Sequence, residues 1–92
     1  MTERIFVRSP AALSRTVDGG ILVTAPGHQE VDRLSATAGA VWTLLDEPRT
    51  VSALVDDLSS VFDAPRDRIA ADVMQLLADL AGRGWIEEVP GA

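Results

Sequence analysis

Residues 32–46 read DRLSATAGAVWTLLD, and the spacing of apolar residues changes within this stretch. Residues 30–34, which overlap its start, alternate polar and apolar side chains, as a half-buried strand does. After Ser35 the apolar residues recur at helical spacing, at Ala38, Val41, Trp42 and Leu45. The Ser35 hydroxyl can cap a helix over residues 36–45, which residues 46–49 then end. The stretch therefore predicts a strand that leads directly into a helix.

Two segments upstream predict further strands, at residues 13–17 and 21–25. Asp18-Gly19-Gly20 lies between them and supplies residues that tolerate the positive φ of a tight hairpin turn. A second turn, at Pro26-Gly27, leads into residues 30–34 and completes a three-stranded meander. Residues 1–10 show no clear period, so a short edge strand and a loose arm both stay open for them.

Two helices and a last strand are expected downstream. Thr50 can cap the second helix, and Asp63 is expected to cap the third, with Pro65 in its first turn. The third helix has a regular apolar stripe: Ile69, Val73, Leu76, Leu77 and Leu80. Gly82 and Gly84 end it, and residues 85–89 predict a short strand. The sequence thus predicts one α+β domain over residues 1–92 with the layout of a winged helix-turn-helix: a three-stranded N-terminal meander, three helices and a short C-terminal strand.

Composition excludes several function classes. The chain of 92 residues has no Cys and one His, so thiolate chemistry and zinc sites built from Cys or several His are not expected. The one His, His28, is expected to be a solvated turn residue. Trp42 and Trp85 stand at core spacing and are expected to be core anchors rather than stacking platforms. No apolar run approaches the roughly 20 residues of a membrane span. We therefore expect a cytoplasmic protein that is no enzyme and holds no cofactor or metal.

The third helix decides between two kinds of partner. The net charge of the chain is -6, and Arg66, Arg68 and Arg83 are balanced by Asp67, Asp72 and Asp79. A helix that enters the major groove of DNA needs a basic exposed face, so nucleic acid is not the expected partner. One flank of the helix carries Ala70, Met74 and Ala81, and its small residues suit close packing, so this flank is expected to pack on the first two helices. The opposite flank, with Arg68, Asp72, Gln75 and Asp79, is expected to look toward the sheet edge or solvent.

The strand over residues 30–34 is the edge of the expected meander. An edge strand offers unpaired N–H and C=O groups and can bind an extended peptide by strand addition. The same open edge could pair two copies of the chain, so a homodimer stays an open alternative.

Residues 32–46 also resemble a segment of the PqqD-like family, in which a leucine and small residues precede Ile/Val-Trp-x-Leu-Leu-Asp. Arg49-Thr50-Val51-Ser52-Ala53-Leu54 resembles the opening of that family's second helix, and Asp72-Val73-Met74-Gln75-Leu76-Leu77 with Gly84-Trp85-Ile86 resembles its third helix and wing. The resemblance covers about residues 15–89. Residues 24–27 read TAPG where members of the PQQ pathway are expected to have Pro-Glu, so a PQQ-type role, a lasso-peptide role and another pathway all stay open.

The resemblance implies a RiPP recognition element, which captures the leader segment of a ribosomally made precursor peptide and presents it to a separate maturation enzyme, such as a radical SAM protein or a peptidase. It implies that the leader adds as a strand to residues 30–34, in a groove closed by the third helix. The site residues so implied are Glu30, Val31, Asp32, Arg33, Leu34, Arg68, Asp72, Val73, Gln75 and Leu76. Two alternatives are kept, a DNA-binding winged-helix regulator and a structural subunit of a larger enzyme.

Overall fold

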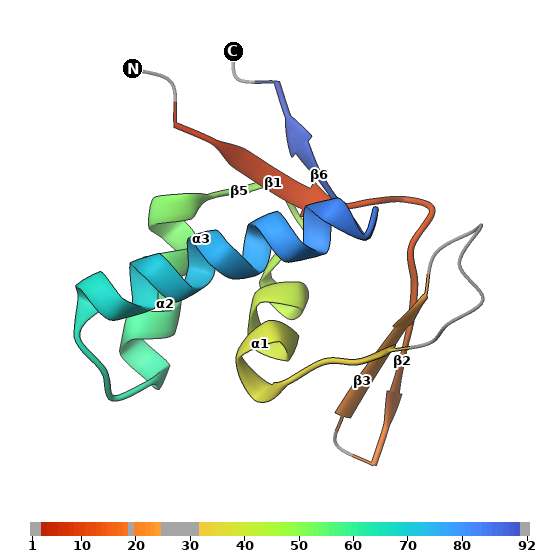
Figure 1. Cartoon of the computed structure of the whole chain (residues 1–92), viewed down its shortest axis with the longest axis horizontal. Helices are drawn as coiled ribbons and strands as arrows, with labels where there is room; N and C mark the ends of the chain where they lie inside the picture. Colours follow the sequence, from red (N-terminus) through yellow and green to blue (C-terminus); the bar gives the residue numbers. More distant parts are fainter. Residues whose placement is uncertain (1–2, 19, 25–31, 91–92) are drawn as a thin grey trace.

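The computed structural model describes residues 3–18, 20–24 and 32–90 and arranges them as two small sheets around three helices (Figure 1). The α+β class and the winged-helix-like arrangement are confirmed. One sheet is formed by a hairpin and a short third strand that extend to one side of the helices. The other lies at the end of the molecule where the described N- and C-terminal segments run side by side (Figure 1).

The first sheet is the expected meander, with strand order β2-β3-β4. It consists of β2 (Leu13–Val17), β3 (Gly20–Thr24) and β4 (Asp32–Arg33), all antiparallel. Asp18 has a φ of 48°, as the tight turn after β2 requires. The Pro26-Gly27 turn, His28, Glu30 and Val31 lie outside the described residues. Leu34 follows β4, and its N–H still donates to the Ile21 carbonyl at 2.9 Å.

The second sheet shows what the N-terminal segment does. β1 (Ile5–Arg8) is its central strand, in the order β5-β1-β6, so both expectations for residues 1–10, an edge strand and a loose arm, were wrong. β6 (Ile86–Val89) is the expected C-terminal strand and pairs with β1 over four residues. β5 (Arg49–Thr50) was not expected. It pairs with Ile5 and Phe6, contacts that no local sequence pattern reveals.

The three helices begin where a cap or a proline allows. Ser35 Oγ accepts the N–H of Ala38 at 3.2 Å at the start of α1 (Ala36–Leu44), and Thr50 Oγ1 accepts the N–H of Ala53 at 3.1 Å at the start of α2 (Val51–Val61). Both caps confirm the sequence prediction.

The expected Asp63 cap of α3 (Arg66–Gly82) was wrong. Pro65 occupies the cap position, and no side chain bonds to the first turn. Asp63 lies two residues too early, because the bend after α2 places Ala64 N–H on the Phe62 carbonyl. The Pro65 carbonyl accepts the N–H groups of Arg68 and Ile69 instead, each at 3.1 Å.

The C-terminus of α3 ends in a Schellman motif. Gly84 has a φ of +78°, its N–H donates to Ala81, and the Trp85 N–H reaches back to Leu80 at 3.1 Å. A side chain at Gly84 would be strained in this left-handed conformation. The motif turns the chain from α3 directly into β6 and fixes Trp85 at the helix end.

The core lies between the helices and both sheets. Trp42 and Trp85 are 1% and 4% exposed, which confirms that they are core anchors. They pack with the buried stripe of α3 and with residues of every other layer: Phe6, Val23, Val41, Leu45, Leu54, Val55, Leu58, Ile69, Val73, Leu77, Leu80 and Ile86. Four of the five residues of the α3 stripe thus lie in the core, whereas Leu76 is only partly buried.

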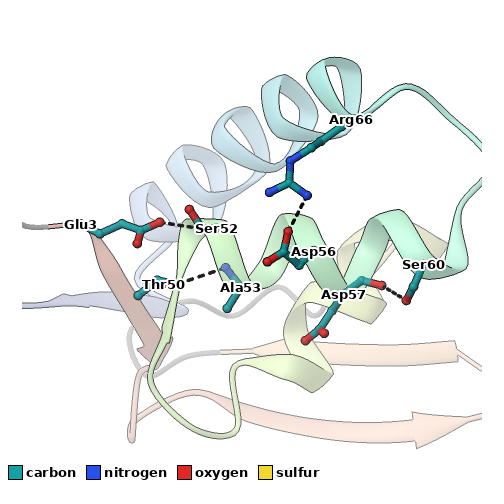
Figure 2. A network of polar contacts seen from close by, with 8 residues as sticks. All are labelled: Glu3, Thr50, Ser52, Ala53, Asp56, Asp57, Ser60 and Arg66. Atoms are coloured by element: carbon teal, nitrogen blue, oxygen red, sulfur yellow. Dashed lines mark hydrogen bonds and ion pairs between the residues drawn. The ribbon is translucent and has the colours of Figure 1, made fainter.

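The N-terminal strand is tied to α2 and β6 by two glutamates. Glu3 Oε1 accepts the N–H of Ser52 in the first turn of α2 at 2.9 Å (Figure 2). Arg4 donates to both carboxylate oxygens of Glu88 at 3.1 Å. Hydrogen bonds from the Ser52 hydroxyl and N–H lower the pKa of Glu3, and the bond from Arg4 lowers the pKa of Glu88.

Figure 2 also shows the ion pair of Asp56 with Arg66, which links α2 to the start of α3 at 2.5 Å.

The buried position of Leu80 predicts a large stability loss on truncation. Leu80 is 1% exposed, so Leu80→Ala leaves a cavity and should lower the free energy of unfolding by about 2–5 kcal/mol. Met74, on the same helix, is 39% exposed, so Met74→Ala should cost no more than about 0.5 kcal/mol. Urea unfolding measures the free energy of unfolding of both variants and of the wild type. Equal losses would contradict the packing described here.

The two glutamates predict a defined pH dependence. Because their pKa values are lower in the folded than in the unfolded chain, both carboxylates stabilise the fold above the ordinary glutamate value of 4.5, and this contribution is lost as the pH falls through the folded values. Melting temperatures measured from pH 6 down to about pH 3 should therefore fall less steeply in the variant Glu3→Gln/Glu88→Gln than in the wild type. Parallel curves would show that these carboxylates do not contribute.

Candidate functional site

The outer edge of β4 carries main-chain groups that face away from β3. The Leu34 N–H points to β3, where it donates to Ile21. In an antiparallel pair, the N–H and C=O of successive residues point alternately toward and away from the partner strand. The N–H and C=O of Arg33 therefore point to the outer edge. Within the described residues β4 pairs with β3 alone, so this edge is open to a further strand.

A groove separates this edge and the start of α1 from the exposed flank of α3. Three adjoining hollows form it and share lining residues. The central hollow is lined by Ser35, Thr37, Asp72, Gln75, Leu76 and Asp79. One end lies between Arg33–Leu34 of the edge and Asp79, Arg83 and Trp85 of the α3 terminus. The other end lies over Phe62, Arg68 and Ile69 and shares Thr37 and Asp72 with the centre.

The residues expected to form the site fall on both walls of this groove. Arg33 and Leu34 lie on the β4 side, and Asp32 belongs to β4 itself. Arg68, Asp72 and Gln75 are exposed on α3, and Leu76 is half-buried between them. Val73 is different: it is fully buried in the core beneath the groove and supports the wall without presenting its side chain. Glu30 and Val31 lie outside the described residues.

The prediction that the opposite flank of α3 packs on the first two helices is only partly confirmed. Ala70 packs against the core, but Met74 and Ala81 are exposed rather than packed on the first two helices. In Figure 1, α2 lies along the N-terminal part of α3, and Met74, further along α3, is 39% exposed.

Sequence reasoning missed several groove residues. Thr37 lies in the first turn of α1, and Phe62 ends α2; only the tertiary arrangement brings them beside α3. Arg83 and Trp85 close the other end because of the Schellman turn. The helical spacing places Asp79 on the same flank as Arg68, Asp72 and Gln75, although the resemblance does not imply it as a site residue. Its carboxylate lies 3.4 Å from Arg83, whose guanidinium stands 5.1 Å from the centre of the Trp85 ring.

In the described part of the chain, no group of three or more His, Asp or Glu side chains is placed to hold a metal ion. None of the described helices is long and apolar enough to cross a membrane. The groove offers instead main-chain groups, carboxylates, guanidinium groups and apolar surface, which are the means of peptide recognition.

The sequence is similar to that of known proteins. A family model described as coenzyme PQQ synthesis protein D (PqqD) matches residues 20–86. Two proteins of Rhodopseudomonas palustris, from strains BisB5 and HaA2 and both named PqqA binding protein, are 42% identical over 45 residues, which is 49% of this chain and 44% of each relative. The chain thus matches less than half the length of these relatives.

Solved structures share the fold. TbiB1 in complex with the TbiA(beta) leader peptide superposes with a TM-score of 0.80 at 22% identity, covering 88% of this chain and 94% of TbiB1. The PqqD truncation of Methylobacterium extorquens PqqCD, described as a functional and stand-alone RiPP recognition element, gives 0.74 at 27% identity and coverages of 90% and 88%. Lasso peptide synthetase B1 complexed with the leader peptide gives 0.75 at 23%, with coverages of 92% and 98%.

The charge of α3 predicts that duplex DNA is not bound. Arg66 is paired with Asp56 and Arg83 with Asp79, so two of the three bases on or beside this helix are already neutralised, on a chain of net charge -6. Few counterions would be released on contact with phosphates. A fluorescence anisotropy titration with mixed-sequence duplexes at physiological salt should show no sub-micromolar binding. Tight binding that weakens with salt would instead favour a winged-helix regulator.

Proposed function

The chain belongs to the family of coenzyme PQQ synthesis protein D, and we propose that it is a non-catalytic recognition module for a ribosomally synthesised precursor peptide. In this proposal the leader segment of the precursor adds as a strand to the open edge of β4, and the module delivers it to a partner maturation enzyme in the cytoplasm, where ribosomal peptides are made. The observation that carries the proposal is the open edge of β4, which faces the exposed flank of α3 across a continuous groove.

Main-chain groups supply the first part of the interaction. An incoming strand that lies along β4 meets the outward N–H and C=O of Arg33, and strand addition of this kind gives affinity that depends little on side chains. The β4 edge is short, so a strand held only there would bind weakly. The α3 wall adds contact area along the same groove.

Side chains on the α3 wall determine which peptide sequences bind. Arg68, Asp72 and Gln75 present charged and amide groups, whereas Leu34 and Leu76 give half-buried apolar surface near the floor. A strand in the groove would turn alternate side chains toward this wall. Specificity would then come from the order of charges and apolar surface along α3.

The comparisons support a binding role. The relatives named PqqA binding protein are described by what they bind, and two of the structures of the same fold carry a leader peptide. Recognition by such a module is productive only when an enzyme acts on the captured peptide. A radical SAM protein or a peptidase encoded near this chain is therefore the partner we propose.

Binding is tested with synthetic peptides. Peptides that tile each short reading frame beside the gene are titrated against the protein by isothermal calorimetry. The proposal expects one tile, near the N-terminus of one precursor, to bind with an affinity at least tenfold above that of its scrambled version. If no tile binds better than its scramble, a leader-binding role is contradicted.

The open edge predicts a specific backbone effect at Arg33. Arg33→Pro removes an N–H that faces the groove without breaking a bond to β3, and it should weaken binding of the recognised tile by about three- to tenfold, the value of roughly one hydrogen bond. Arg33→Ala is the matched control, because it removes the guanidinium and keeps the N–H. Circular dichroism melts check that both variants fold. Equal loss in the two variants would assign the effect to the side chain rather than to the strand edge.

A further inference from the structure

The centre of the groove is acidic. The central hollow contains two carboxylates, Asp72 and Asp79, and no base. At one end Arg68 lines the hollow together with Asp63, and at the other end Arg83 is paired with Asp79. Of the three hollows, only the central one presents carboxylates with no base in its lining.

The two central carboxylates flank an apolar surface. On a helix, Asp72, Leu76 and Asp79 occupy one stripe, because positions four and three apart lie nearly above one another. At 1.5 Å per residue, Asp72 and Asp79 are about 10 Å apart along the axis, with Leu76 between them. Gln75 adds an amide on the same side of the hollow. Leu76 is half-buried, whereas both aspartates are exposed.

Both carboxylates can accept a new partner. Asp72 has no ion-pair partner in the described part of the chain, although it lies on the wall shared by two hollows. Asp79 contacts Arg83 at 3.4 Å, but both side chains are about half exposed, and a surface pair of this kind contributes little to stability. A cation that enters the hollow would thus meet two carboxylates with no strong bond to break.

From this arrangement we infer that the groove selects a leader strand with a single basic side chain at its centre, which lays its aliphatic part on Leu76 and places its charged end between Asp72 and Asp79. The inference rests on the proposed leader-binding role. Each end hollow already contains a base, Arg68 at one end and Arg83 at the other, so a second base in the strand would gain less there than at the centre. The occupant is therefore a strand with one base at its centre, and not a polybasic segment.

A random library of 12-residue peptides displayed on phage tests the inference without knowledge of the natural leader. The library is selected on the wild type, on Asp72→Asn/Asp79→Asn, and on Asp57→Asn/Glu87→Gln. The last variant is the matched control, because it changes net charge by the same amount at exposed positions outside the groove. Melting curves establish that all three proteins are folded.

The wild type and the control variant should both enrich peptides with one Arg or Lys at a fixed distance from an apolar residue. Asp72→Asn/Asp79→Asn should lose this preference. Replacing the base of an enriched peptide by Gln should weaken binding to the wild type by about tenfold and binding to Asp72→Asn/Asp79→Asn by less than about twofold.

The other outcomes distinguish failure of this inference from failure of the proposed leader-binding role. Enriched peptides without a basic preference, or with polybasic runs, overturn this inference and leave the leader-binding role standing. The same preference on Asp72→Asn/Asp79→Asn also overturns it, since long-range attraction to an acidic protein would then be the cause. Selection that enriches no peptide on any of the three proteins contradicts the proposed function itself.

Discussion

One main-chain hydrogen bond decides what the edge of the meander can do. The Leu34 N–H donates to the Ile21 carbonyl at 2.9 Å just beyond the end of β4. This bond sets the register of a very short strand and thereby decides that the Arg33 main-chain groups face outward. It also positions the next residue, Ser35, whose hydroxyl begins α1. The open edge and the first helix turn beside it depend on the same few atoms.

The facing wall is held by different forces. α3 is anchored by its buried stripe and by the Schellman turn that leads into β6. β6 in turn pairs with β1, which is tied to α2 through Glu3. The wall is therefore held in place by contacts between residues far apart in the sequence. The groove is thus built between a short edge strand and a firmly packed helix.

Most of the architecture could be predicted from the sequence, because local signals agree with one another. The turn at Asp18, the caps Ser35 and Thr50, and the apolar stripe of α3 each arise from neighbouring residues. The central position of β1 and the existence of β5 could not be predicted, since two-residue pairings between distant segments leave no periodic pattern. Asp63 failed as a cap because proline two residues later took that position.

Only some of the groove residues could be predicted from the sequence. Helical spacing placed Arg68, Asp72, Gln75 and Asp79 on one flank, and the meander placed Arg33 and Leu34 on an edge. The distance between this flank and this edge depends on how core packing positions α3 beside α1. Thr37 and Trp85 line the groove only because of that packing. Val73 belongs to the regular apolar stripe of α3 and is buried in the core. Its spacing alone could not show whether its side chain lines the groove or only supports the groove wall from beneath.

Amide hydrogen exchange at Arg33, followed by NMR with and without a bound peptide, tests strand addition at β4 most directly. In the free protein the Arg33 amide faces away from β3, whereas the Leu34 amide is already bonded to Ile21 and serves as an internal reference. We predict that saturation with a recognised peptide slows exchange at Arg33 and leaves Leu34 nearly unchanged. A saturated complex in which the Arg33 amide exchanges as fast as in the free protein would contradict the account.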